Sequence, residues 1–171
     1  MDGNELRAMQ APIKEKYRND PKLAMITLKA KGSLDAPGIA CKVETGRQLS
    51  AAGLHPATGG SGLELCSGDM LLEALAACAG VTLRAVATSL GIEVGGGAVR
   101  AEGDLDFRGT LAVDRESPVG FRAIRLEFEL EASEEELATL LKLTERYCVV
   151  LQTLARGPEL DVKLERAAAT A

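Results

Sequence analysis

The chain has 171 residues, which is enough for one domain with a hydrophobic core. Hydrophobic residues make up 46% of the chain but aromatic residues only 3%, and tryptophan is absent, so leucine, alanine and valine must fill the interior. The formal net charge of -5 argues against nucleic acid or an anionic membrane as the main partner. The first twenty residues mix charges without an apolar segment, so we expect no secretory signal there.

The beginning of the chain predicts a lead-in followed by short strands. Residues 1–20 are expected to be a lead-in, because Pro12 interrupts the amphipathic helix that Glu5–Arg18 would otherwise form. A single domain is expected over residues 21–171. Its first strands are predicted at 23–31, 39–44 and 48–53, with turns at 35–38 and 45–46.

A glycine-rich loop at residues 54–62 precedes the next element. Glycines before a helix are compatible with phosphate binding, but this loop lacks the Gly-Lys-Ser/Thr ending of a P-loop. His55 is the only histidine of the chain and is followed by proline. We therefore favour a turn residue over a metal ligand or a base at this position.

A long helix is predicted to begin at Ser67 and to end before Gly91. Its sequence is apolar on nearly all sides, which predicts a helix enclosed by a sheet or by a second subunit. The apolar stretch 70–81 is interrupted by Glu73 and is too short to span a bilayer.

Apolar and polar residues alternate in the second half of the chain, over residues 100–107 and 124–131. This pattern predicts antiparallel strands with one buried and one solvated face. Ser133 and Glu136 have the spacing of a capping box, which predicts a helix running to about Arg146. A short helix at 148–155 and a last strand containing Leu160, Val162 and Leu164 are expected to follow.

The four cysteines are predicted to be thiols at rest in a reducing compartment, so that any disulfide among them is transient and functional. Cys78 lies in the apolar helix, and Cys148 follows the charged helix of the second half. Cys66 is a further thiol that can resolve or compete, and Cys41 is expected to pack within a strand. No pair has the spacing of a metal site, so we expect no metal and no other cofactor.

Two segments resemble the cysteine motifs of the OsmC/Ohr family of osmotically induced and organic hydroperoxide resistance proteins: Met70-Leu-Leu-Glu-Ala-Leu-Ala-Ala-Cys78 and Glu145-Arg-Tyr-Cys148. The resemblance covers about residues 25–164. It implies an α+β, OsmC-like fold in which antiparallel sheets wrap around buried central helices. It further implies an intertwined homodimer with active sites at the subunit boundary.

The resemblance also implies a cysteine-based thiol peroxidase, an antioxidant enzyme of the cytoplasm. Cys78 would attack an organic hydroperoxide and become a sulfenate, and Cys148 would resolve it through an intramolecular disulfide. A dithiol of the lipoyl type would be the reductant. The expected partners are therefore a second copy of the chain, the hydroperoxide and the dithiol, with neither nucleic acid nor membrane.

The residues that would activate Cys78 depart from the family pattern. The family uses an arginine from the early strands, but residues 33–38 contain none, and Arg47 is the nearest candidate. The family glutamate falls at Gly68, beside Asp69, which is equally a first-turn acid of its helix. Nine residues of helix rise ~13 Å, so Asp69 cannot touch Cys78 of its own helix.

Further candidates lie near the second cysteine. Arg146 either forms part of the pocket or ends its helix favourably. Cys148 is expected to be the better placed thiol electrostatically, because it precedes a short helix. The family often has proline after this cysteine, where this chain has Val149. An alternative function is therefore an OsmC-like scaffold without peroxidase activity, which binds a small apolar ligand or a protein partner.

Overall fold

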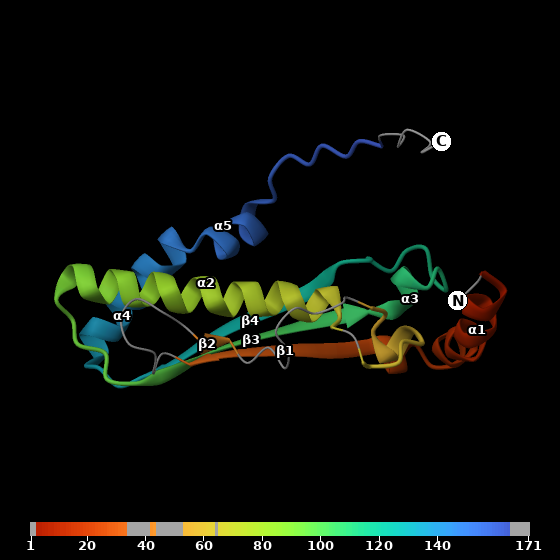
Figure 1. Cartoon of the computed structure of the whole chain (residues 1–171), viewed down its shortest axis with the longest axis horizontal. Helices are drawn as coiled ribbons and strands as arrows, with labels where there is room; N and C mark the ends of the chain where they lie inside the picture. Colours follow the sequence, from red (N-terminus) through yellow and green to blue (C-terminus); the bar gives the residue numbers. More distant parts are fainter. Residues whose placement is uncertain (1–2, 34–41, 44–52, 64, 165–171) are drawn as a thin grey trace, which may run out of the picture.

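The computed structural model describes residues 3–33, 42–43, 53–63 and 65–164. An antiparallel sheet forms one layer, and the long helix α2 lies along one of its faces (Figure 1). The strand order is β2-β1-β3-β4. This mixed architecture confirms the predicted α+β class.

The helices and strands have the following bounds, with the short 3-10 helices written η: α1 (Gly3–Asn19), η1 (Pro21–Ala24), β1 (Met25–Ser33), β2 (Lys42–Val43), η2 (Pro56–Thr58), α2 (Ser67–Leu90), β3 (Gly97–Asp106), α3 (Phe107–Thr110), β4 (Phe121–Leu130), α4 (Glu134–Tyr147) and α5 (Val149–Arg156). The turns and strand residues predicted at 34–41 and 44–52 lie outside the described residues.

The N-terminal segment differs from the prediction, because α1 continues through Pro12. Ile13 and Tyr17 pack against the main core, and the Tyr17 hydroxyl donates to the Ala57 carbonyl at 2.6 Å. These contacts offset the hydrogen bond that proline removes from the helix. The expectation that Pro12 interrupts the helix is wrong, and the division of the chain at residue 20 stays a prediction.

The helix α2 has the bounds that its sequence predicts. Gly91 ends it in the left-handed conformation, with φ of 67°, and its N–H bonds the carbonyls of Ala87 and Thr88. By length and composition α2 could cross a membrane, since it is longer than the apolar stretch 70–81. In this fold it is the core helix, packed against the sheet and α4. Its buried residues are Leu72, Leu75, Ala76, Ala79, Gly80, Leu83, Val86 and Ala87.

The strands β3 and β4 confirm the predicted alternation. Val99, Ala101 and Leu105 of β3 are buried, whereas the intervening charged side chains reach solvent. On the solvated face Arg125 of β4 bonds Asp104 of β3 at 2.6 Å. The two strands pair along almost their whole length, so β3 is central in the sheet and β4 forms one edge.

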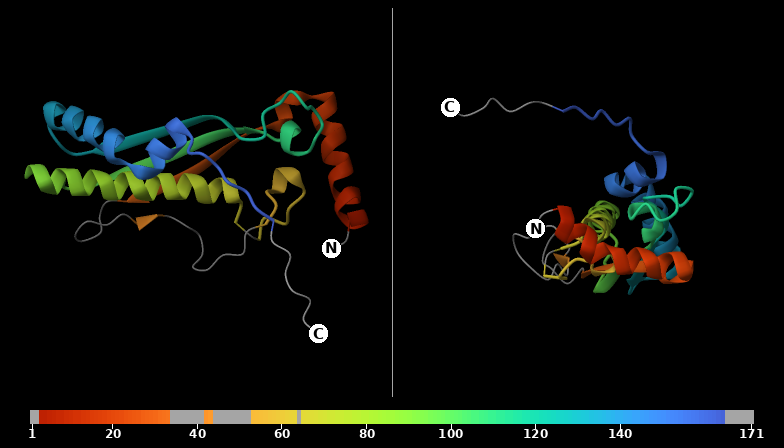
Figure 2. Two further views of the ribbon diagram at one scale, coloured as in Figure 1. Left: turned by 90° about the horizontal axis from the view of Figure 1, so that it is seen from above. Right: turned by 90° about the vertical axis from the view of Figure 1, so that its right-hand side faces the viewer.

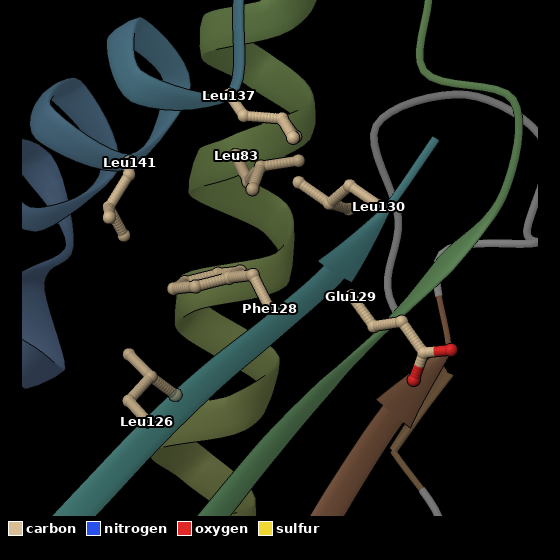
Figure 3. A pocket seen from close by; sticks show the side chains of 7 residues that line it. All are labelled: Leu83, Leu126, Phe128, Glu129, Leu130, Leu137 and Leu141. Atoms are coloured by element: carbon tan, nitrogen blue, oxygen red, sulfur yellow. The ribbon is translucent and has the colours of Figure 1, made fainter. Parts of the chain in front are cut away.

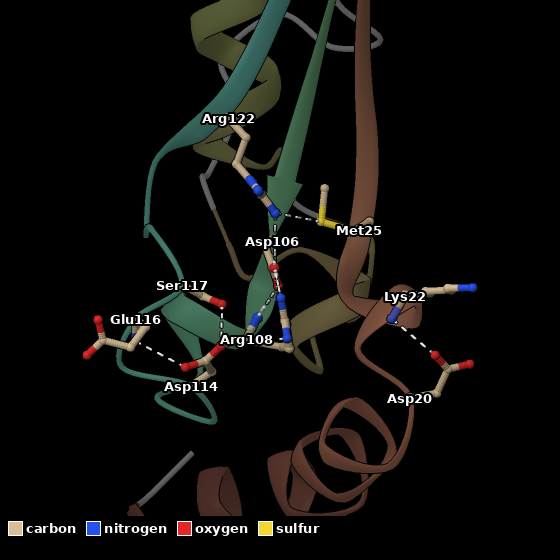
Figure 4. A network of polar contacts seen from close by, with 9 residues as sticks. All are labelled: Asp20, Lys22, Met25, Asp106, Arg108, Asp114, Glu116, Ser117 and Arg122. Carbon is tan, nitrogen blue, oxygen red and sulfur yellow. Dashed lines mark hydrogen bonds and ion pairs between the residues drawn. The ribbon is translucent and has the colours of Figure 1, made fainter.

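A buried carboxylate organises the end of β3 (Figure 4). Asp106, whose side chain is inaccessible to solvent, accepts three bonds from the Arg108 guanidinium, at 3.0, 3.1 and 2.5 Å. Arg122 of β4 approaches the same carboxylate at 3.7 Å. Arg108 lies 3.6 Å from Asp114, which in turn accepts from the Ser117 hydroxyl at 2.8 Å. This network ties β3, β4 and the loop between them together.

Two helices follow the sheet and meet at one cysteine. The predicted capping box is present in α4, where the Ser133 N–H donates to the Glu136 carboxylate at 3.0 Å. The helix α4 ends at Tyr147 and α5 begins at Val149, so Cys148 alone joins them.

The predicted last strand is wrong for the single chain. Residues 157–164 are extended but belong to neither helix nor strand. Figures 1 and 2 show this segment, which we call the C-terminal tail, leaving the body from the end of α5, on the side of α2 that faces away from the sheet. No other strand of the described chain lies beside it to bond its backbone, so the alternating pattern alone does not make it a strand.

Candidate active site

The two motif cysteines approach each other from different helices. Cys78 lies in the middle of α2, is half-buried and packs against the main core. Cys148 is fully buried between α4 and α5, and its N–H bonds the Thr144 carbonyl at 2.9 Å. The two side chains are hydrogen-bonded to each other, and both cysteines are free thiols. The fold therefore brings together two sulfur atoms that are distant in sequence.

Cys78 receives hydrogen bonds from several directions. Two come from backbone N–H groups of Val149 and Val150 at the start of α5, one from the Cys148 thiol and one from the Thr82 side chain. The first N–H groups of a helix have no partner within it, and two of those at the start of α5 help to lower the pKa of Cys78. Thr82 follows Cys78 by one helical turn, which places the two side chains on the same face.

These donors decide the protonation of Cys78. Burial raises the pKa of the thiol, but the hydrogen bonds from Val150, Cys148, Val149 and Thr82 outweigh burial, so the pKa lies below its ordinary value. Within the part of the chain that the structure describes, no cationic side chain contributes to this shift. Neutral donors therefore favour the thiolate at Cys78.

Cys148 behaves in the opposite way. Burial raises the pKa of its thiol to about 11, assisted by the bond that it donates to Cys78 and by the charge of that sulfur, despite backbone donors at Leu151 and Val150. The expectation that Cys148 is the better placed thiolate is therefore wrong. The N–H groups of Val149 and Val150, at the start of α5, act on the sulfur of Cys78. Burial is the largest effect on the pKa of Cys148 and raises it.

The other predicted site residues that the structure describes do not contribute to the lowered pKa of Cys78. Asp69 lies in the first turn of α2. Its pKa is raised, because burial raises it more than the charge of His55 lowers it. Arg146 is exposed and stacks its guanidinium over the Tyr147 ring, 5.4 Å from the ring centroid. Neither contributes to the shift at Cys78. Arg47 lies outside the described residues.

The remaining thiols and the histidine are placed elsewhere. Cys66 precedes the first turn of α2 and lines a hollow of about 380 Å³ together with His55 and Phe107. His55 begins the turn η2, accepts a bond from the Ala57 N–H at 3.0 Å and stacks on Phe107. It is thus the turn residue that the sequence favoured. Cys41 lies outside the described residues.

Sequence reasoning missed the donors to Cys78. The spacing from Cys78 to Thr82 was a usable signal, because residues four apart share a helix face. This chain has Val149 at the position after Cys148 where the family often has proline. Its consequence, a free N–H beside the sulfur, depends on how α5 docks on α2.

The fold and the paired thiols define a class of protein, which the comparisons with known proteins identify. The family model of OsmC-like proteins matches residues 60–163, and the chain belongs to this family. The fold is shared with an OsmC-like hydroperoxide resistance protein from Jannaschia sp. CCS1, with a TM-score of 0.56 and 16% sequence identity over 86% of this chain and 97% of that one. No curated protein matches the chain.

Val149→Pro tests the backbone donors directly. Proline is favoured at the first position of a helix, so α5 should be retained while one N–H to Cys78 is lost. We expect the pKa of Cys78 to rise, measured by the ultraviolet absorbance of the thiolate during a pH titration. Val149→Ala, which keeps the N–H, is the matched control and should titrate like the wild type. An unchanged titration in Val149→Pro would show that this donor does not act on the thiolate.

Proposed function

We propose that the chain is a thiol peroxidase that reduces organic hydroperoxides, with Cys78 as the attacking residue and Cys148 as the resolving one. The observation that carries this proposal is the pair of hydrogen-bonded thiols whose pKa values shift in opposite directions. A nucleophile must be deprotonated, whereas a resolving thiol can begin as the proton donor.

The chemistry follows from these two states. The Cys78 thiolate attacks a peroxide oxygen, so a sulfur–oxygen bond forms, the oxygen–oxygen bond breaks and the sulfur is oxidised to a sulfenic acid. The Cys148 thiol gives its proton to the departing alkoxide, which leaves as an alcohol. The resulting Cys148 thiolate attacks the sulfenic sulfur, forming the disulfide and releasing hydroxide. A dithiol of the lipoyl class then reduces the disulfide to two thiols.

The surroundings of the sulfurs support an organic substrate. Val150, Leu151 and Leu154 of α5 pack with Cys78 against the main core. Apolar walls favour a hydroperoxide with a hydrocarbon body, because burying that body removes apolar surface from water. They also limit access of water to the sulfenic acid before Cys148 reacts.

The proposal includes two copies of the chain in a reducing compartment such as the cytoplasm. Met70, Ala74, Val81 and Ala85 are exposed on the side of α2 that neither the sheet nor the other helices cover. Their spacing is that of an apolar helix stripe, and the alanines permit close approach of another helix. A homodimer would bury this stripe, and a reducing compartment would keep the two thiols free at rest.

Stopped-flow measurement with cumene hydroperoxide and dihydrolipoamide tests the proposal. We expect consumption well above that by the free dithiol, and a disulfide between Cys78 and Cys148 in the mass spectrum of the protein after one turnover. The rate should rise with pH and level off below the pKa of an ordinary thiol, because the pKa of Cys78 is lowered. Consumption no faster than that of the dithiol alone would instead favour the binding scaffold without peroxidase activity.

A further inference from the structure

The helix α4 carries a buried hydroxyl one turn before Cys148. Thr144 is fully buried, and its side-chain oxygen has no hydrogen-bond partner in the part of the chain that the structure describes. A threonine in a helix can bond the carbonyl four residues before it, but Thr144 does not. Because a buried hydroxyl without a partner costs stability, we expect this one to have its partner in another state of the molecule.

The side of α4 that carries Thr144 faces α2. Leu137 lines an apolar groove together with Leu83 of α2 (Figure 3). At the other end of α4, Cys148 is hydrogen-bonded to Cys78 of α2. Thr144 follows Leu137 by two helical turns and precedes Cys148 by one, so all three lie on one face of α4. The hydroxyl is therefore enclosed between the two helices that carry the thiols.

Thr144 has the spacing that lets a hydroxyl reach the sulfur of Cys148. The Cys148 N–H bonds the Thr144 carbonyl at 2.9 Å, so Cys148 continues the last turn of α4. Residues four apart in a helix have Cβ atoms only ~5–6 Å apart. Thr82 is separated from Cys78 by the same four residues on α2, and its side chain does donate to that sulfur. In this fold, a threonine one turn away can thus serve a cysteine.

The charges on the two sulfurs explain why only one of the two threonines is in use. In the resting pair Cys148 is protonated and donates to Cys78, and a protonated sulfur is a weak acceptor. A disulfide sulfur carries no charge either. Cys148 becomes a strong acceptor only as a thiolate, and it is then a fully buried charge whose donors are the backbone N–H groups of Val150 and Leu151.

We infer that the Thr144 hydroxyl donates a hydrogen bond to the Cys148 sulfur when a dithiol opens the disulfide between Cys78 and Cys148. Thr144 would then have the partner that it lacks in the resting pair. The inference deepens the proposed function and rests on it for the role of the disulfide.

The reductive step places the charge where Thr144 lies. Cys78 is half-buried whereas Cys148 is inaccessible, so a thiolate of the dithiol attacks the Cys78 sulfur. A sulfur–sulfur bond forms there, the bond to Cys148 breaks, and its electron pair stays on the Cys148 sulfur beside Thr144. The second thiol of the reductant gives its proton to Cys148 and attacks the mixed disulfide. The dithiol leaves as its own disulfide, and Cys78 is again a thiolate.

The test forms the disulfide with diamide, which removes the two thiol hydrogen atoms, so it does not need the peroxide reaction. Thr144→Val removes the hydroxyl and keeps the branched shape of the side chain. Thr144→Ser keeps the hydroxyl and is the matched control. Quenched-flow reduction by dithiothreitol, followed by alkylation and intact mass, measures the rate at which the disulfide opens. Circular dichroism measures the Tm of the reduced proteins.

We expect the disulfide of Thr144→Val to be reduced at least about 10-fold more slowly than that of the wild type, and that of Thr144→Ser within about 3-fold of it, because only the first loses a bond to a buried charge. The Tm of Thr144→Val should rise by roughly 2 °C or more, since a buried hydroxyl without a partner is removed. A variant that is slower but more stable cannot owe its rate to a damaged fold.

Three results would overturn the inference: equal reduction rates in the wild type and Thr144→Val, a Thr144→Ser variant as slow as Thr144→Val, or a Thr144→Val variant that is less stable than the wild type or does not fold. A mixed disulfide on Cys148 after brief reaction with glutathione would also overturn it, because Cys148 would not be the departing sulfur. These measurements use no hydroperoxide. A failure of the peroxide assay and a failure of this inference are therefore distinguishable.

Discussion

Cys78→Ser is expected to reduce hydroperoxide turnover by at least about 1,000-fold, because a serine hydroxyl cannot take the place of the thiolate that attacks the peroxide. The hydrogen-bond donors around position 78 would remain, so the loss reports the sulfur itself. The measurement is consumption of cumene hydroperoxide with dihydrolipoamide in excess. Circular dichroism of the variant checks that the fold is retained.

Cys148→Ser separates the two thiols in the same assay. Its hydroxyl can still donate to Cys78, so the first step should proceed, but no disulfide can form. We expect an adduct with one added oxygen on Cys78 in the intact mass, followed by over-oxidation with excess peroxide. Cys66→Ser is the control thiol variant and should turn over like the wild type. Equal impairment by Cys66→Ser, or full activity in Cys78→Ser, would refute the assignment of roles.

Asp106→Asn is expected to lower the free energy of unfolding by about 3 kcal/mol, because it removes the buried charge of the ion pair and leaves Arg108 with only the more distant, partly exposed Asp114. For a chain of this size the corresponding fall in Tm is roughly 6–12 °C. Asp104→Asn is the matched control, since Asp104 pairs with Arg125 on the solvated face of the same strand. It should cost no more than about 1 kcal/mol.

The same residue gives stability a pH dependence. The bonds from Arg108, together with its charge and that of Arg122, outweigh burial and hold the pKa of Asp106 below its ordinary value. The unfolded chain therefore binds the proton more readily. The stabilising contribution is present above the ordinary carboxyl pKa and is lost as the pH falls through the lower pKa of the folded state.

Urea unfolding of the wild type and of Asp106→Asn at about pH 7 and about pH 3 measures this contribution. The difference between the two proteins should shrink at the acidic pH. A difference that is equal at both values would mean that the charge of Asp106 does not stabilise the fold.

Local sequence signals predicted much of this fold. The stop at Gly91, the capping box at Ser133 and the alternation in β3 and β4 are all present as expected. Each depends on neighbouring residues, which a sequence shows directly. The helix through Pro12 and the unpaired tail were missed, because each depends on a contact with a distant element or its absence.

The candidate site was predictable to a similar degree. The motifs selected Cys78 and Cys148, and the fold brings them together. The charged candidates Asp69 and Arg146 are not among the groups that shift the pKa of Cys78, and their part in the site stays a prediction. The N–H groups of α5 beside Cys78 belong to the backbone, which every residue except proline supplies. No side-chain pattern identifies them before the docking of α5 is known.

The position of the two thiols gives oxidation a mechanical consequence. Cys78 lies on the core helix α2, and Cys148 is the single residue that joins α4 to α5. A covalent link between them would enclose β3, β4 and α4 in one closed ring of chain. Such a ring restricts the unfolded polypeptide and is worth about 4 kcal/mol of resistance to unfolding. Oxidation of the two thiols would thus also raise the free energy of unfolding of the chain, and reduction of the disulfide would remove this gain.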